Sequence, residues 1–277
     1  MRMTTRCRGG DRPAGVLVIS RGDLTRPNCA GDPVIRVETS GHVSVLTLDG
    51  GKANAMSLEL LEHIIDAFDG LDGAVVITGV GSAFSAGVDL QRIVDGGASY
   101  VEPFLGALSH AFVKVFSHPA PVVAAINGHA IAGGCVLAAA CDRRLMASGR
   151  IGLTELAVGV PFPVAGLEIS RFAFGTAAAR LALGAELFTP AEAHALGVVD
   201  QVTEASDLMG EAIDLATRLG SFAPQAYHAT KHELHAPTMA RIAAGQATDE
   251  EVLRSWCSEE TRARIVTQLE AMAAKRS

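Results

Sequence analysis

Val-Val-Ala-Ala-Ile-Asn-Gly-His-Ala-Ile-Ala-Gly-Gly-Cys occupies residues 122–135 and joins an apolar run to a turn rich in small residues. The apolar run from Val122 to Ile126 predicts a buried strand, and Asn127-Gly128 predicts a turn. An Ala/Gly-rich helix is expected near 133–140, and another short strand over 142–147. A strand followed by a turn and a helix is the unit of an α/β layered core with crossover helices.

The sequence before residue 122 repeats this order of elements. Apolar and polar residues alternate on both sides of Ser40-Gly41, which predicts a pair of strands. Ser57 precedes apolar residues at helical spacing and is the expected N-cap of a helix. The predicted elements are strands over 34–39, 42–48 and 74–79, a helix from 58 to 68, a Gly/Ser-rich loop at 81–88 and a helix over 104–117.

After about residue 205 the pattern becomes wholly helical. Helices are expected over 206–219, over 224–235 and along a charged segment from 239 to 275. We therefore divide the chain into an N-terminal extension, 1–33, an α/β core, 34–205, and a C-terminal helical region, 206–277. Because the last region has no strands of its own, it is expected to pack on its own core or on a partner subunit, as an oligomerisation or lid region.

Composition excludes several classes of protein. Hydrophobic residues make up 49% and charged residues 19% of the 277, which is a globular composition. The formal net charge of −7 argues against nucleic acid as a partner. No apolar run approaches the roughly 18 residues of a membrane span. The five cysteines form no CxxC pair, so neither a zinc site nor a disulfide framework is expected, and the predicted location is cytoplasmic.

The extension 1–33 is rich in arginine and interrupted by prolines. Its apolar residues 16–19 are too few for a secretory signal, while its arginine content resembles a transit peptide. We interpret it as an extension outside the core, with its role open.

Two turns rich in small residues follow apolar strands, one at 81–90 (GSAFSAGVDL) and the other at 127–135. Small residues let the backbone approach a ligand closely, so two such turns could direct two N–H donors at one oxygen, as in an oxyanion hole. Tight packing alone would explain these glycines equally well. Neither turn matches GxGxxG or GxxxxGK[ST]. Ala83 stands where a GxSxG serine-hydrolase elbow has glycine, which disfavours that class.

Four motifs in order resemble the crotonase superfamily, also called the enoyl-CoA hydratase/isomerase family. The motifs are Lys52–Met56, Ala83–Leu90, Asn127–Val136 with Cys141-Asp142, and Phe188–Asp200, and the resemblance runs from about residue 34 to 275. The resemblance implies an α/β fold, the crotonase-like spiral of ββα units with a C-terminal helical region. It also implies a homotrimer or homohexamer that acts on a small-molecule acyl-CoA, with no metal and no cofactor besides the coenzyme A of the substrate.

Carried over by position, the resemblance places the thioester oxygen between the N–H groups of Ala86 and Gly133. The coenzyme A would lie against the turn that begins at Lys52. The implied substrate contacts are Lys52, Ala53, Asn54 and Ala55 in that turn, and Ser85, Gly87, Val88, Asp89, Leu90, His129, Gly134 and Val136 around the two glycine-rich turns.

The carboxylates distinguish the reactions. Hydratases of the family have two glutamates, whereas here the first of these positions is Val136 and only the second, Glu155, is acidic. The string around Glu155 is similar to the one-glutamate Δ3,Δ2-enoyl-CoA isomerases, so Glu155 is the expected sole acid/base. The alternatives are a hydratase (a lyase) with a non-standard second acid, a non-catalytic acyl-CoA-binding homologue, and another hydrolase or lyase. Without the resemblance, we would interpret Glu155 as a surface glutamate at the N-terminus of a helix, where the helix dipole favours a negative charge.

Other polar residues receive structural interpretations. Asp89 is expected to cap or brace its loop, and Asp142 to form a structural pair. Lys231 is expected to be a solvated helix charge, and Trp256 an anchor for the terminal helices. His129 could line the pocket or serve the turn. The pocket shape formed by 90–115, on which acyl specificity depends, does not follow from the sequence.

Overall fold

The computed structural model describes residues 17–19 and 34–274, except for the side chains of 17–19, Val34 and Lys52. The N-terminal extension predicted over 1–33 therefore lies outside the described residues, apart from the short strand at 17–19. The last three residues, 275–277, lie outside them as well.

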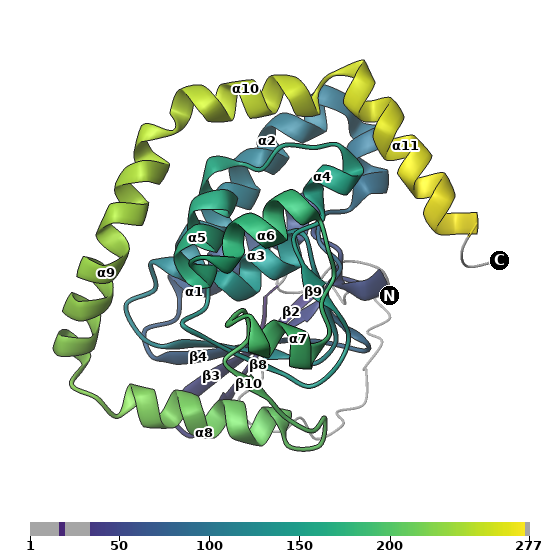
Figure 1. Ribbon diagram of the computed structural model, residues 1–277. Coiled ribbons are helices and arrows are strands. Elements are labelled where there is room, and N and C mark those ends of the chain that lie inside the picture. The colour runs from purple at the N-terminus through teal and green to yellow at the C-terminus, as the bar shows by residue number, and fades with distance from the viewer. Residues whose placement is uncertain (1–16, 20–33, 275–277) are drawn as a thin grey trace, which may run out of the picture.

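A mixed seven-stranded sheet forms the centre of the fold (Figure 1). Its first three strands are antiparallel neighbours and the others pair in parallel. In spatial order the strands are β1 (Leu17–Ile19), β2 (Val34–Ser40), β3 (Val43–Asp49), β4 (Ala74–Gly79), β6 (Val122–Ile126), β8 (Arg143–Met146) and β10 (Gln201–Val202). A second, parallel sheet has three short strands, which are β5 (Ala83–Ser85), β7 (His129–Ile131) and β9 (Ile151–Gly152).

The helices follow the strands in an α/β order that continues into a helical C-terminal part. They are α1 (Leu58–Asp69), α2 (Leu90–Phe116), α3 (Gly133–Ala139), α4 (Glu155–Val158), α5 (Val164–Phe174), α6 (Ala177–Gly184), α7 (Pro190–Ala195), α8 (Leu208–Gly220), α9 (Pro224–Ala244), α10 (Gln246–Trp256) and α11 (Glu259–Ala274). A 3-10 turn, Lys52–Asn54, precedes α1.

Alternation along the central strands builds a core on each face of the sheet. Val75 and Ile77 of β4 belong to the larger core, which α1, α2, α3 and α5 cover. Val76, their neighbour in sequence, points to the opposite face, where Leu208 and Ala212 of α8 cover it. Successive side chains of a strand point to opposite faces, so one apolar strand is buried by two layers of helices. This confirms the predicted α/β layered core.

The predicted strand pair and the first helix are confirmed. β2 and β3 pair with Ser40 opposite Val43, and Gly41 in the turn has a φ of 61°. Ser57 caps α1, because its Oγ accepts a hydrogen bond from the N–H of Leu60 at 3.3 Å.

Two helix predictions were wrong in extent. The helix expected from 104 begins at Leu90, although Gly97, with φ 57° and ψ −156°, divides α2 into two helical pieces. The charged segment expected to be one helix from 239 to 275 belongs to three helices. α9 runs on past Pro237 to residue 244, and breaks at Gly245 and Cys257 separate it from α10 and α11.

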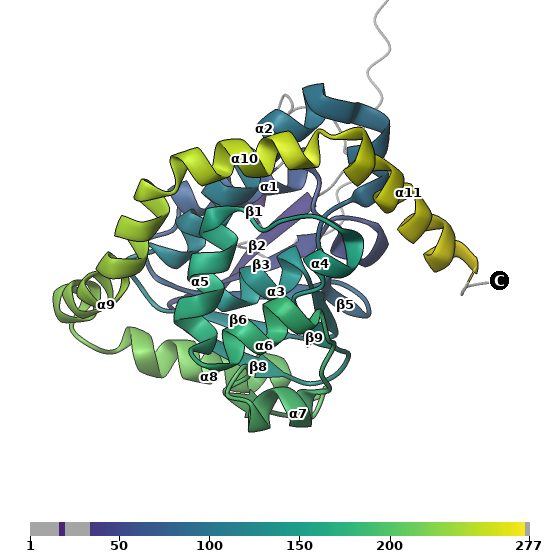
Figure 2. The ribbon, with the colours of Figure 1, turned by 45° about the horizontal axis from the view of Figure 1, so that its top comes forward.

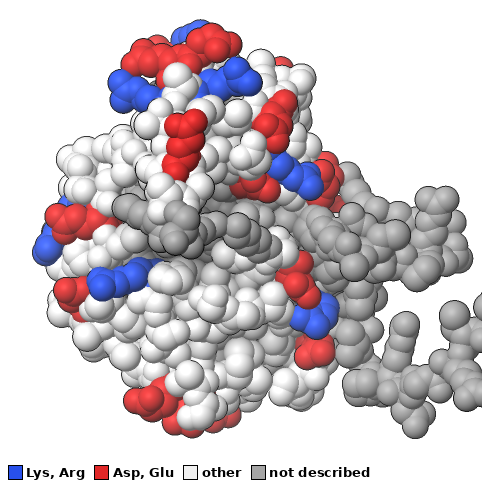
Figure 3. Space-filling model, turned by 90° about the vertical axis from the view of Figure 1, so that its right-hand side faces the viewer, with Lys and Arg blue, Asp and Glu red and all other residues white. Residues whose placement is uncertain are grey.

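The helices α9, α10 and α11 form a strap along the outside of the core (Figures 1 and 2). α9 packs on α5, α10 on α2, and α11 on both α2 and α4. Seen from the side at which α11 lies (Figure 3), the described surface carries scattered charges of both signs rather than a broad basic patch. Within the described residues, no helix has the length and apolar character needed to cross a membrane.

Candidate active site

A cavity of about 380 Å³ lies between the two glycine-rich turns, the short helix α4 and the C-terminal strap. Its walls come from segments that are far apart in the sequence and are predominantly apolar. The lining includes Ala86, Val88, Leu90, Leu108, Phe112, Ile131, Gly133, Val136, Thr154, Glu155, Val158, Phe162, Pro163, Gly166, Leu187, Trp256, Gln268 and Met272. This volume is near the lower end of the ~300–1,000 Å³ of small-molecule sites.

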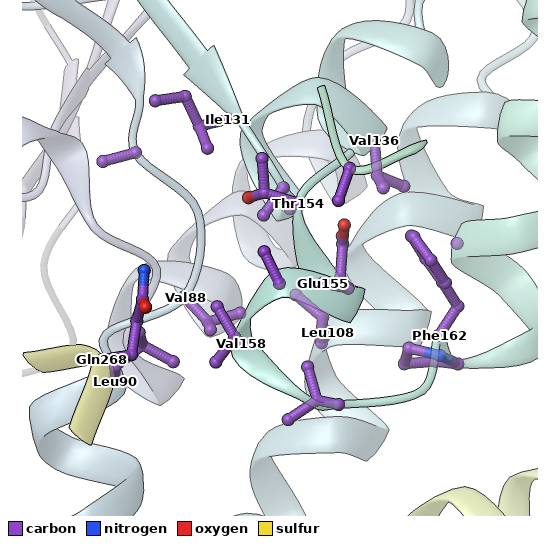
Figure 4. Close-up of a pocket in the computed structure, with 18 of the residues that line it drawn as sticks. Val88, Leu90, Leu108, Ile131, Val136, Thr154, Glu155, Val158, Phe162 and Gln268 are labelled. Atoms are coloured by element: carbon purple, nitrogen blue, oxygen red, sulfur yellow. The ribbon is translucent and has the colours of Figure 1, made fainter. Parts of the chain in front are cut away.

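Glu155 lies at the start of α4 and points into this cavity (Figure 4). The helix is one turn long, because Gly159, with a φ of 87°, ends it and donates its N–H to the carbonyl oxygen of Glu155. The residue is only 8% exposed, so it is not the surface glutamate of the alternative interpretation. The tight turn places a carboxyl group inside an apolar cavity.

The carboxyl group of Glu155 has little to stabilise its charge. Its Oε2 atom is buried and has no hydrogen-bond partner among the described residues. Burial raises the pKa of Glu155 to about 8, although a backbone hydrogen bond partly opposes this. Such a carboxyl group holds its proton through most of the acidic range and can exchange it near neutral pH. That is the property required of a general base.

Glu155 is the only ionisable side chain among the described residues that line the cavity. Val136, at the position where a second carboxylate was considered, is 2% exposed and presents methyl groups. Trp256 turns its Nε1–H away to the carbonyl oxygen of Pro161 at 2.9 Å. Thr154 and Gln268 supply the remaining polar side chains of this lining.

The first glycine-rich turn places its donors differently from the prediction. The N–H of Ala86 donates to the carbonyl oxygen of Ala53 at 2.9 Å and so is engaged within the protein. Ala86 lines the cavity, but the assignment of its N–H to an oxyanion hole is contradicted by this hydrogen bond. The turn was identified correctly from sequence, whereas the direction of each peptide group within it depends on pairing with the segment around Ala53.

Val88 is the better placed donor in this turn. It forms a parallel bridge with Met56, whose N–H donates to Gly87 O at 2.7 Å and whose carbonyl accepts from Asp89 N at 3.0 Å. Both bonds are made by the peptide groups on either side of Val88, as in a parallel ladder. The carbonyl of Gly87 points toward Met56, so the N–H of Val88, which belongs to the same trans peptide group, points away from Met56. No backbone hydrogen bond of the Val88 N–H is found within the described part of the chain.

Gly133 opens α3 on the other side of the cavity. It follows Ala132, which has a φ of 50°, and the first N–H groups of a helix have no partner within the helix. The two turns touch, since a Cβ on Gly87 would lie 3.3 Å from the nitrogen of Gly133. The structure thus brings the backbone around Val88 and Gly133 together beside Glu155.

Asn54 and Ser85 brace the turn and are fully buried. Asn54 Nδ2 donates to the carbonyl oxygen of Ala83 at 2.8 Å, and Ser85 Oγ donates to that of Asn54 at 2.8 Å. Gly134 lets the turn pack closely, because a Cβ there would lie 2.2 Å from Ser85 O. These three predicted contact residues therefore hold the backbone in place and leave no side-chain group facing the cavity.

The remaining predicted contacts lie at the edge of the site or outside it. The side chain of Lys52 is outside the described part of the chain, and Ala53 and Ala55 belong to the turn that receives the Ala86 N–H. Asp89 caps α2 by accepting from Arg92 N at 3.2 Å, as expected. His129 is exposed on β7 and is absent from the cavity lining, so the interpretation that it lines the pocket is wrong. Val88, Leu90 and Val136 do line it.

Sequence reasoning missed most of the apolar wall. Leu108 and Phe112 come from α2, Phe162 from the segment before α5, and Met272 from the last helix. These residues have the spacing of ordinary core positions, so nothing in the sequence separates them from the core. Trp256 was expected as an anchor, and it also contributes to the wall.

Lys231 is buried, which contradicts its interpretation as a solvated charge. Its Nζ atom lies 2.8 Å from Asp142 Oδ2 and 3.3 Å from the carbonyl oxygen of Ala120. Asp142 also accepts from Val122 N at 2.7 Å, so its expected structural pairing is confirmed. Burial and this carboxylate raise the pKa of Tyr227 above its ordinary value.

The comparisons with known proteins match this architecture. The Enoyl-CoA hydratase/isomerase family matches residues 38–275. This chain therefore belongs to the enoyl-CoA hydratase/isomerase family, whose fold is the crotonase-type α/β spiral with a C-terminal helical region, and whose substrates are acyl-CoA thioesters. The resemblance read from the four motifs is confirmed.

Some relatives are named as hydratases and others as isomerases. A putative enoyl-CoA hydratase of Thermus thermophilus is 36% identical over 211 residues, which cover 73% of this chain and 83% of the relative. Human mitochondrial enoyl-CoA delta isomerase 1 is 26% identical over 250 residues, covering 87% and 83%. The crystal structure of human mitochondrial delta3-delta2-enoyl-CoA isomerase superposes with a TM-score of 0.83 at 25% identity, covering 88% of this chain and 99% of that one. The choice between the two reactions rests on the site.

Proposed function

We propose that this protein is a Δ3,Δ2-enoyl-CoA isomerase in which Glu155 is the sole acid/base. The observation that carries the proposal is that Glu155 is the only ionisable side chain among the described residues lining the cavity. Moving a double bond needs one group that removes a proton from C2 and returns one to C4. One carboxyl group with a pKa of about 8 suits both steps near neutral pH.

In the proposed reaction, the ionised Glu155 carboxylate takes a proton from C2 of a 3-enoyl thioester. The electron pair of that C–H bond moves into the conjugated system, and the thioester oxygen gains negative charge as a dienolate. The protonated Glu155 then gives a proton to C4, which leaves the double bond between C2 and C3. Protons and electrons balance, so the chemistry calls for neither a redox cofactor nor a metal ion.

The backbone N–H groups of Val88 and Gly133 would hold the thioester oxygen while its charge develops. Donors that are fixed before the reaction stabilise such charge without reorganising, an effect of roughly 3–4 kcal/mol per donor at comparable sites. Val88 is favoured over Ala86 because the Ala86 N–H is already bonded to Ala53 O.

Hydration is the second candidate, and the apolar position of Val136 argues against it. Adding water to a double bond benefits from one group that activates the water and another that donates to carbon. The absence of one acid/base group typically lowers the rate by about 10²–10⁴. A homologue that only binds acyl-CoA is a third candidate and requires that Glu155 be irrelevant to turnover.

A paired assay separates the three candidates. The full-length protein is tested with trans-3-hexenoyl-CoA for isomerisation and with crotonyl-CoA for hydration, in parallel with Glu155→Gln and the control Glu251→Gln. Glu251 is a suitable control because its side chain is 75% exposed and lies outside the cavity. We expect fast isomerisation, slow hydration, loss of both in Glu155→Gln, and no change in Glu251→Gln.

Two other results would reject the proposal. Fast hydration of crotonyl-CoA would identify a hydratase with a second acid or an ordered water. Equal turnover by the unaltered protein and Glu155→Gln would show that this carboxyl group is not the acid/base. The homotrimeric or homohexameric assembly and the cytoplasmic location remain predictions, which light scattering of the purified protein and cell fractionation would test.

A further inference from the structure

The cavity extends to both sides of Glu155 (Figure 4). In Figure 4, Val88, Leu90 and Gln268 lie on one side of Glu155, and Phe162 lies on the other. We define the distal compartment as the part of the cavity lined by Val136, Phe162, Pro163, Gly166 and Trp256. Residues from α3, α5 and α10 thus meet at a part of the cavity that the proposed proton transfer does not use.

The described side chains that line the distal compartment offer a ligand hydrocarbon contacts and no free polar atom. Trp256 carries the one polar side-chain atom among its five residues, and that atom donates to Pro161 O at 2.9 Å. Val136 is 2% exposed. A charged or hydroxylated group placed here would lose its water without a replacement partner, whereas an alkyl chain would gain from burial.

The orientation of the thioester follows from the proposed function, on which this inference rests. The turn expected to hold the coenzyme A is joined to the Val88 side of the cavity, through the hydrogen bonds of Met56 to Gly87 and Asp89. With the thioester oxygen at Val88 and Gly133, and C2 to C4 beside Glu155, the rest of the acyl chain extends into the distal compartment.

Gly166 leaves the space in this compartment open. A Cβ at this position would lie 3.7 and 3.8 Å from the two methyl carbons of Val136, which is ordinary van der Waals contact. Alanine would therefore fit, but a longer side chain would have to occupy the cavity. Gly166 and Val136 therefore adjoin on one wall of the compartment, and the bulk of their side chains affects how much room the compartment leaves.

We propose that the distal compartment selects straight acyl chains of medium length, because the whole cavity holds only about 380 Å³, and that the small side chains at Gly166 and Val136 set the upper limit. Shorter chains leave the compartment partly empty. Longer or branched chains meet the walls formed by Phe162 and Trp256.

The proposal is tested by calorimetric titration with saturated acyl-CoAs from butyryl to dodecanoyl, which the enzyme cannot isomerise. For the unaltered protein we expect binding to tighten about fourfold per added methylene and to level off near decanoyl-CoA. Gly166→Leu should bind butyryl-CoA normally but octanoyl-CoA at least tenfold more weakly. Gly210→Leu is the matched control, because Gly210 is an exposed helical glycine of α8 with no atom near its absent Cβ.

Chain-length dependence that is identical in Gly166→Leu and the unaltered protein would overturn the proposal, as would affinity that does not vary with chain length. If circular dichroism shows that Gly166→Leu is unfolded, Val136→Ala replaces it. In that variant the affinity should level off at a longer chain length than in the unaltered protein. Levelling off at the same chain length would overturn the proposal. Selection by length without isomerisation would reject the proposed function alone, whereas isomerisation without selection would reject the compartment alone.

Discussion

Lys231 on α9 and Asp142, just before β8, form a buried ion pair at 2.8 Å that joins the C-terminal strap to the seven-stranded sheet. The two side chains are 7% and 14% exposed, so both charges depend on each other and on nearby backbone groups. Asp142 Oδ2 also accepts from Val122 N, at the first residue of the strand that leads to the second glycine-rich turn. The pair thus fixes α9, the first helix of the strap, to the start of β6, the strand that leads to the second glycine-rich turn.

Replacing the charged side chain of Lys231 with an uncharged one should destabilise the protein strongly. Lys231→Met leaves the Asp142 carboxylate buried without its partner, an effect of about 3–5 kcal/mol on the free energy of unfolding. Arg254→Met is the control, because Arg254 and Glu251 form an exposed pair at 4.0 Å, and its effect should stay within ~0.5 kcal/mol. Urea unfolding measures both. A loss for Lys231→Met no larger than that of the control would contradict a coupled pair.

The pKa of Glu155 predicts how stability changes with pH. Its pKa of about 8 in the folded protein exceeds the ordinary value of 4.5, so the unfolded chain releases this proton first as pH rises. The contribution of Glu155 is therefore fully present below about pH 4.5 and is lost as pH rises through about 8. Relative to Glu155→Gln, the unaltered protein should lose about 2–5 kcal/mol between pH 5 and pH 9. Parallel stability curves for the two proteins would contradict the raised pKa.

The same pKa predicts a pH profile for catalysis. The proposed base must be ionised before it removes the C2 proton, so kcat/KM should rise about tenfold per pH unit below the pKa and level off above about 8. Initial rates with trans-3-hexenoyl-CoA from pH 6 to 9 would measure this rise. A profile that is flat across this interval would mean that the group that removes the proton is already ionised at pH 6.

Gly134 should tolerate no side chain. An alanine Cβ would lie 2.2 Å from Ser85 O and 2.9 Å from its carbonyl carbon, so β5 and the following turn with Val88 would have to move. We expect Gly134→Ala to destabilise the protein by about 3 kcal/mol and to lower kcat/KM. Gly210→Ala, at an open helical position, should be stabilising by about 0.5–1 kcal/mol. Thermal unfolding compares the two, and similar melting temperatures would show that β5 can yield.

The sequence predicted those parts of the site that depend on local pattern. The strand over 122–126, the turn after it and the helix from 133 follow from apolar runs and small residues, and the structure has all three. Motif order also identified the family and located Glu155. These features depend on residues that are close together in the chain.

Features set by distant partners could not be predicted in the same way. Whether the N–H of Ala86 is available depends on Ala53, and whether Lys231 is solvated depends on Asp142. The start of α2 was missed because Gly96, Gly97 and Pro103 weaken the helical pattern. In the structure, Asp89 caps the N-terminus of α2 and α2 packs against α1, and these interactions outweigh the local penalties.

The hydrogen bond from Trp256 to Pro161 joins residues 95 positions apart, and Gln268 and Met272 complete the cavity from still later in the chain. Ribosomes add about 5–20 residues per second, so Glu155 is made several seconds before the wall that keeps water from it. Until α10 and α11 dock, the part of the wall formed by Trp256, Gln268 and Met272 is missing, and we expect water to reach the carboxyl group. The environment proposed to make Glu155 a base is thus completed only at the end of synthesis, and a chain cut short before Trp256 would lack this part of the cavity wall.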